Sequence, residues 1–235
     1  MGAGVQPADY GETWTYESIV GALPGIRLSA AQAIALQVGL FEAAVLLLAW
    51  GYDLWTAVVP GTVAVAVAAV GSLAMLRLGR GVREQDVPEP YRRLLFGSSI
   101  EVVLSVLAFV ALVTHLFVFD PARAAEPLLA GLFGSEPPVP VVYLMLLVLW
   151  DLCYRIGTSW WAAVVSLWRS LRYTFDPETG RALARLDATN VAFAGVQALL
   201  VPFLVDQPVL LAAVGGHVVA VTVVSAAAIL ATRFR

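Results

Sequence analysis

The stretch SIEVVLSVLAFVALVTHLFVF, residues 99–119, decides the fold. It contains one carboxylate, Glu101, and one imidazole, His115, among side chains that are mostly apolar. An α-helix rises about 1.5 Å per residue, so about 20 such residues cross the roughly 30 Å hydrocarbon core of a membrane. The stretch therefore predicts a transmembrane helix.

Other parts of the chain repeat this pattern. The apolar segments, this one included, are 28–50, 55–75, 99–119, 139–161, 189–205 and 209–231. They lack the alternation of barrel strands, and a backbone that crosses lipid must satisfy its own hydrogen bonds. The sequence therefore predicts an all-α fold, with a six-helix transmembrane domain over residues 28–232.

The N-terminal segment 1–27 precedes this domain. Its residues 10–23 are apolar and aromatic enough to form a helix that lies on the membrane surface. An ordered tail packed against the bundle fits this composition equally well.

The composition excludes several classes of protein. Of 235 residues, 60% are hydrophobic and 13% are charged, against about 25% charged in an average soluble domain. The net charge of −3 is not the excess of basic charge that is typical of nucleic-acid-binding proteins. The lone Cys153 excludes an internal disulfide and any multi-cysteine metal site. Lysine is absent, which excludes a retinal Schiff base.

The arginines predict the orientation. They cluster between the second and third segments, between the fourth and fifth, and near both ends of the chain, whereas the other three connections hold only Arg123. Arginine-rich connections remain on the cytoplasmic side of a membrane. We therefore expect a multi-pass protein of the cell membrane with both termini in the cytoplasm.

Two runs carry a resemblance to a known family. YGETWTYESIVGALPG (10–25) and WDLCYRIGTSWW (150–161) resemble an uncharacterised haloarchaeal family of polytopic membrane proteins, a domain of unknown function. The lysine-free, alanine- and valine-rich composition fits that origin, although a high-GC actinobacterial chain has a similar composition. The resemblance implies no functional residue.

Polar residues within the apolar segments form a candidate site. Burying an ionisable group in a membrane costs free energy, so each such group is a candidate for a functional site. Asp151 and Arg155 are four residues apart, so they share one helix face and can pair. Counting residues from the segment ends places the others at similar depth. The candidate midplane polar site is Glu42, Asp151, Arg155, Gln197 and His217.

The function of such a site stays open between three classes of protein. Its acids could bind a cation or relay a proton in a small-solute or ion transporter, which is the first hypothesis. An Asp151–Arg155 pair that only fixes helix packing would suit a non-catalytic scaffold or partner subunit. A redox or lipid-modifying enzyme is the third class, with His115 and His217 as the one possible pair of haem ligands.

The expected partners follow from the same segments. Small residues recur at every fourth position, at Ala64, Ala68 and Ser72 and at Ala212, Gly216 and Ala220. Such stripes allow helices to approach closely, within the chain, in a homo-oligomer or against a membrane partner protein. Membrane lipids are the other expected partner. No metal site and no cofactor are predicted.

Overall fold

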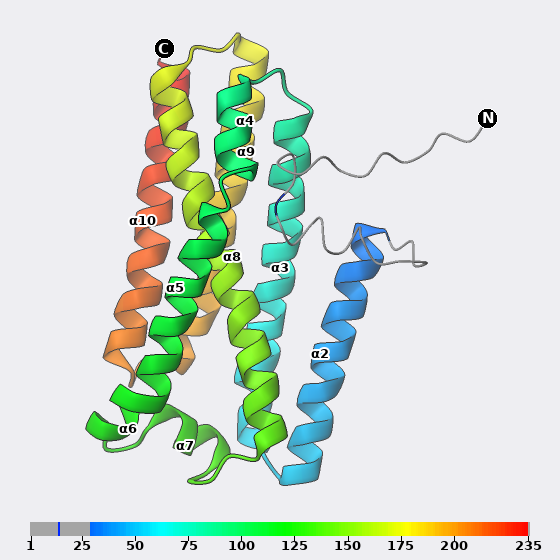
Figure 1. Cartoon of the computed structure of the whole chain (residues 1–235), viewed down its shortest axis with the longest axis vertical. Helices are drawn as coiled ribbons and strands as arrows, with labels where there is room; N and C mark the ends of the chain where they lie inside the picture. The colour runs from blue at the N-terminus through cyan, green and yellow to red at the C-terminus, as the bar shows by residue number, and fades with distance from the viewer. Residues whose placement is uncertain (1–13, 15–28, 235) are drawn as a thin grey trace, which may run out of the picture.

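The computed structural model describes Trp14 and residues 29–234 (Figure 1). All regular structure in these residues is helical. Six stretches are long and apolar enough to cross a membrane; they contain α2 (Ala30–Tyr52), α3 (Val58–Arg83), α5 (Ile100–Thr114), α8 (Val139–Arg172), α9 (Pro177–Gln197) and α10 (Pro208–Arg233). The predicted all-α, six-helix membrane fold is confirmed.

The two ends of the bundle differ in charge. The ends of α3, α8 and α10 and the start of α9 lie together with the short helix α4 (Glu89–Phe96) at one end (Figure 1). We call it the arginine-rich end, because Arg83, Arg172, Arg181 and Arg233 lie there. The short helices α6 (Asp120–Arg123) and α7 (Leu128–Phe133) lie at the opposite, arginine-poor end. That the arginine-rich end faces the cytoplasm remains a prediction.

Several helices continue beyond the apolar segments at the arginine-rich end. Helix α8 extends to Arg172 and α9 begins at Pro177. The connection between the fourth and fifth apolar segments is therefore largely helical. The Oδ1 atom of Asp176 accepts hydrogen bonds from the backbone nitrogens of Glu178 and Thr179, which caps α9. Hydrogen bonds from Thr179 and Glu178 lower the pKa of this exposed carboxyl. The Asp-Pro pair is thus a helix start.

Helix α4 is held against the bundle through its last turn. The backbone carbonyls at a helix end lack partners within the helix. The indole Nε1 of Trp161 in α8 donates to the Leu94 carbonyl at 3.1 Å, and that of Trp14 donates to the Leu95 carbonyl at 3.2 Å. Trp14 also packs edge-on against Phe96. The chain then turns through Ser99, in the left-handed region at φ 53°, before α5 begins.

The arginine-poor end has less regular structure. A 3-10 turn (η1, Trp55–Ala57) precedes α3, and a π-helical turn (η2, His115–Phe119) joins α5 directly to α6. Helix α9 tightens into a 3-10 segment (η3, Ala198–Phe203) that contains Pro202, which has no N–H to donate. These segments surround the cavity described below.

Helix α8 lies at the centre of the bundle. It packs against α2, α3, α4, α5, α9 and α10. Glycines permit close approaches between helices: Phe193 and Leu186 of α9 pack against Gly71 and Gly81 of α3, and Ser105 of α5 packs against Gly157 of α8. A Cβ atom at position 157 would lie 2.9 Å from the backbone nitrogen of Ser105, a distance that real contacts do not show.

We expect Gly157→Ala to destabilise the bundle by about 1–3 kcal/mol, because α5 must move away from α8. Gly195→Ala is the matched control, since a Cβ atom at position 195 meets nothing within 4 Å and alanine favours a helix. Thermal unfolding of the two purified variants in one detergent measures the difference. Equal midpoints would show that the α5–α8 contact does not depend on Gly157.

Candidate functional site

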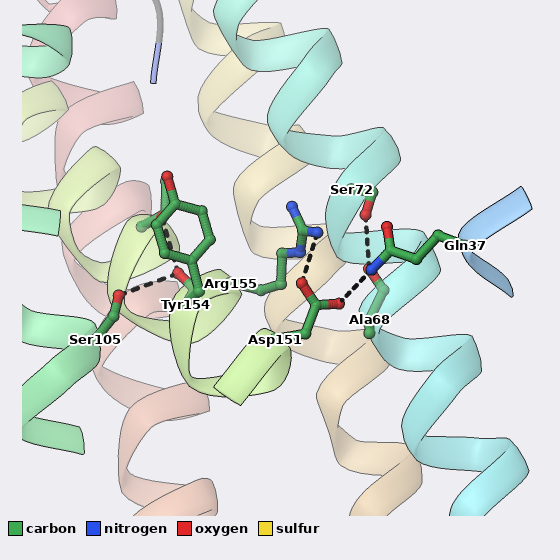
Figure 2. A network of polar contacts seen from close by, with 8 residues as sticks. Gln37, Ala68, Ser72, Ser105, Asp151, Tyr154 and Arg155 are labelled. Atoms are coloured by element: carbon green, nitrogen blue, oxygen red, sulfur yellow. Dashed lines mark hydrogen bonds and ion pairs between the residues drawn. The ribbon is translucent and has the colours of Figure 1, made fainter. Parts of the chain in front are cut away.

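The centre of the bundle holds a buried ion pair with an amide partner. Arg155 Nη2 donates to Asp151 Oδ1 at 2.8 Å, one turn away on α8, and Gln37 Nε2 from α2 donates to Asp151 Oδ2 at 3.1 Å (Figure 2). The Asp151 and Arg155 side chains are 9% and 2% exposed. Both carboxylate oxygens therefore have hydrogen-bonded partners, and the network fastens α2 to α8.

The other residues of the predicted site lie apart from this network. Glu42 of α2 accepts a hydrogen bond from the Thr62 hydroxyl of α3 at 2.8 Å. Gln197 is fully buried in α9, with no hydrogen-bond partner for either amide atom among the described residues. His217 is half-buried in α10. The hydrogen bond of Glu42 thus leads to α3, whereas the network around Asp151 is formed with Arg155 and Gln37.

A small cavity borders the network. Its volume is about 10 Å³, close to the space that one water molecule needs, and its walls include Gln37, Phe41, Ala69 and Asp151. It lies between α2, α3 and α8. A water molecule there would have two polar side chains within its walls.

Further polar contacts follow α8 toward the arginine-rich end. The Ser159 hydroxyl donates to Asn190 Oδ1 at 2.8 Å, and the Asn190 amide donates back to the Ser159 carbonyl at 2.9 Å. This reciprocal pair joins α8 to α9. Glu101 of α5, outside the predicted site, is fully buried, and neither of its carboxylate oxygens has a hydrogen-bond partner in the described part of the chain.

A second buried ion pair closes the arginine-rich end. Arg169 Nη2 of α8 contacts Asp187 Oδ2 of α9 at 2.7 Å, and Arg169 Nη1 donates to the Tyr91 hydroxyl of α4 at 3.0 Å. The two charged side chains are 1% and 2% exposed. One guanidinium thus joins α4, α8 and α9. Arg169 and Asp187 both lie outside the predicted apolar segments, so this ion pair was not predicted from sequence.

The half of the bundle near the arginine-poor end contains a large apolar cavity. Its volume is about 450 Å³, and it is partly open to its surroundings. Helices α2, α3, α5, α7, α8 and α10 and the turns η1, η2 and η3 contribute to its walls. Thr56 and Cys153 carry the only side-chain heteroatoms capable of hydrogen bonding, and no charged residue lines it. Cys153 is a free thiol buried in this wall.

Asp120 supports one wall of this cavity. Its Oδ2 accepts a hydrogen bond from the backbone nitrogen of Leu128 at 2.7 Å, so the start of α7 is fixed to the start of α6. Leu129 of α7 then packs with Leu116 and Leu210 in a separate apolar cluster. Sequence reasoning missed the cavity, because its walls come from nine separate helices and turns that carry ordinary apolar residues.

The histidines and the small-residue stripes are distributed differently from the polar network. His115 lies in η2 and His217 in α10, and haem ligation by this pair remains a hypothesis. Among the described residues, no group of three or more His, Cys, Asp or Glu side chains could hold a metal ion. Ala68 and Ser72 of the α3 stripe are buried inside the bundle, whereas Ala212 and Gly216 of the α10 stripe are exposed on its surface.

These features define a polytopic α-helical membrane protein with a polar network in its centre and an apolar cavity beside it. A family model matches residues 9–228, and the chain belongs to that family, described as Family of unknown function (DUF7530). No curated protein and no solved structure was found to match it.

We expect Asp151→Leu to destabilise the protein by about 3–5 kcal/mol, because it leaves the buried Arg155 guanidinium without its carboxylate. The double variant Asp151→Leu/Arg155→Met removes both charges and should recover most of that loss. Thermal unfolding in detergent compares the two. If the double variant is no more stable than the single one, Asp151 and Arg155 do not offset each other's buried charge.

Proposed function

We propose that this protein binds an apolar molecule of the membrane in the cavity between its helices. The observation that carries the proposal is the cavity itself. Ligand sites are typically 300–1,000 Å³ in volume and mainly apolar, and this cavity of about 450 Å³ matches both properties.

The free energy of an empty cavity supports this proposal. An enclosed void in a protein core costs about 24 cal/mol per Å³ of its volume, so any part of this space that stayed empty would be unfavourable. Because the cavity is partly open, a molecule of the membrane can enter it. Water is a poor filler, because it needs two to four polar partners and the walls offer few. A hydrocarbon chain restores the missing dispersion contacts.

The polar network contributes to this function by fixing the bundle on one side of the cavity. Asp151 and Arg155 lie on α8 next to Leu152 and Cys153 of the cavity wall. Gln37 fastens α2 there, while Val45 and Leu48 of the same helix line the cavity further along. In this proposal the buried charges position helices and do not contact the bound molecule. The protein would lie in the cell membrane with its arginine-rich end in the cytoplasm.

Filling the cavity tests the proposal. Ala64 lines the cavity on α3, whereas Ala66 of the same helix is exposed on the outer surface of the bundle. We expect Ala64→Phe to reduce saturable binding of a pyrene-labelled decanol at least severalfold, because the phenyl ring occupies the site. Ala66→Phe is the matched control and should bind as the unaltered protein does. Energy transfer from tryptophan to pyrene in detergent micelles reports binding.

If Ala64→Phe binds the probe as well as Ala66→Phe does, the cavity is not the binding site. Unfolding midpoints measured on the same samples separate this outcome from a misfolded variant.

Transport of a proton or small ion is a second candidate, and the water-sized cavity beside Gln37 and Asp151 favours it. Ala69 lines this cavity. In a Cys153→Ala background, we expect a cysteine introduced by Ala69→Cys to react with a membrane-impermeant thiol reagent if water reaches the site, since thiolates form readily only in water. Ala66→Cys is the control: this site is exposed on the membrane-spanning part of the same helix, where the surroundings are lipid, and its thiol should not react. Absence of labelling in folded protein would remove the aqueous pathway.

A further inference from the structure

We infer that the molecule bound in the apolar cavity is an amphiphile whose polar end carries no negative charge and whose chain alone enters the bundle. This inference rests on the proposed function and adds the chemical class of the ligand. Its basis is the charge of the segments that surround the cavity at the arginine-poor end.

The cavity walls do not accommodate a charged or strongly polar headgroup. Among the wall residues only Thr56 and Cys153 carry polar side-chain atoms, and no charged residue is present. A charge transferred into such walls would lose its hydration without gaining a partner. The headgroup of a bound amphiphile must therefore stay outside, at the polar boundary of the membrane near the arginine-poor end.

Exposed carboxylates lie close in sequence to residues of the cavity wall at that end of the bundle. Asp53 directly precedes the wall residue Leu54, and Glu126 lies two residues before the wall residue Leu128. Glu136 follows the wall residue Phe133 by three positions, and Asp206 follows Leu204 by two. All four are exposed. We call these four residues, Asp53, Glu126, Glu136 and Asp206, the acidic rim.

The described part of this end has little opposing charge. Arg123 of α6 is its one guanidinium, and its Cζ atom lies 5.2 Å from the centre of the Phe119 ring. Asp120, which caps α7, adds a fifth carboxylate behind the rim. Negative charges next to these wall segments repel an anionic headgroup and attract a cationic one, over a range of about 10 Å at 0.1 M salt. The rim therefore discriminates by charge, and the cavity by apolarity.

Three probes that share one pyrenyl-decyl chain test this inference. They end in an alcohol, a trimethylammonium group or a sulfate, and they are titrated into the full-length protein in uncharged maltoside micelles. We expect the ammonium probe to bind most tightly and the sulfate probe most weakly, with about a tenfold spread at low salt that shrinks at high salt. The alcohol probe should bind with little dependence on salt.

Neutral variants of the rim identify the source of the discrimination. The variant Asp53→Asn/Glu126→Gln/Glu136→Gln/Asp206→Asn should reduce the spread severalfold while leaving alcohol binding unchanged. Asparagine suits position 53, whose φ is 56°. The matched control Glu84→Gln/Asp86→Asn/Glu89→Gln/Glu178→Gln neutralises four exposed acids at the arginine-rich end and should retain the full spread.

The possible results separate the two proposals. If the alcohol probe binds and Ala64→Phe abolishes that binding, but the sulfate probe binds as tightly as the ammonium probe, the headgroup inference is overturned and the cavity remains a binding site. If the rim variant keeps the full spread, the rim is not its source and the inference is again overturned. If no probe shows binding sensitive to Ala64→Phe, the proposed function fails and the inference fails with it.

Discussion

A polar group inside a membrane must find its partner within the protein, and this constraint organises the whole bundle. Among the described residues, helix α8 carries more of the buried polar and charged side chains than any other helix, and several of them fasten another helix to it. Asp151 holds α2 through Gln37, Ser159 holds α9 through Asn190, and Arg169 holds α9 and α4 through Asp187 and Tyr91. In lipid, where apolar surfaces gain little by leaving the solvent, such bonds and close packing decide which helices are neighbours.

The distribution of these contacts divides the protein into two halves. Most of the described hydrogen bonds and ion pairs between the long helices occur from Asp151 toward the arginine-rich end, together with the glycine contacts at Gly71 and Gly157, whereas the Glu42–Thr62 bond lies on the other side of Asp151. Toward the arginine-poor end the interior is apolar and incompletely filled, and its walls consist partly of short helices and turns. In the proposed function, the polar half maintains the fold while the apolar half accommodates the bound molecule.

Some of this arrangement could be predicted from sequence. Apolar length alone identifies the six crossings, and the spacing of four residues predicts the Asp151–Arg155 pair. Depth along a helix is not enough to place Glu42, because contacts also depend on the angle around the helix axis, and Glu42 faces Thr62. The Arg169–Asp187 pair was missed because apolar segments end where charges begin, although the helices continue. The cavity depends on tertiary packing and has no local pattern.

The length of α8 has a mechanical consequence. Its 34 residues span about 51 Å, whereas the hydrocarbon core is about 30 Å thick. About 20 Å of rigid rod therefore lies beyond the hydrocarbon, and α9, joined to it by a four-residue connection, runs back beside it. Thermal opening concentrates where contacts are fewest. The two ends therefore differ in stiffness. The paired helices α8 and α9 are stiff at the arginine-rich end, and the short helices and turns around the cavity can fluctuate at the other end without disturbing them.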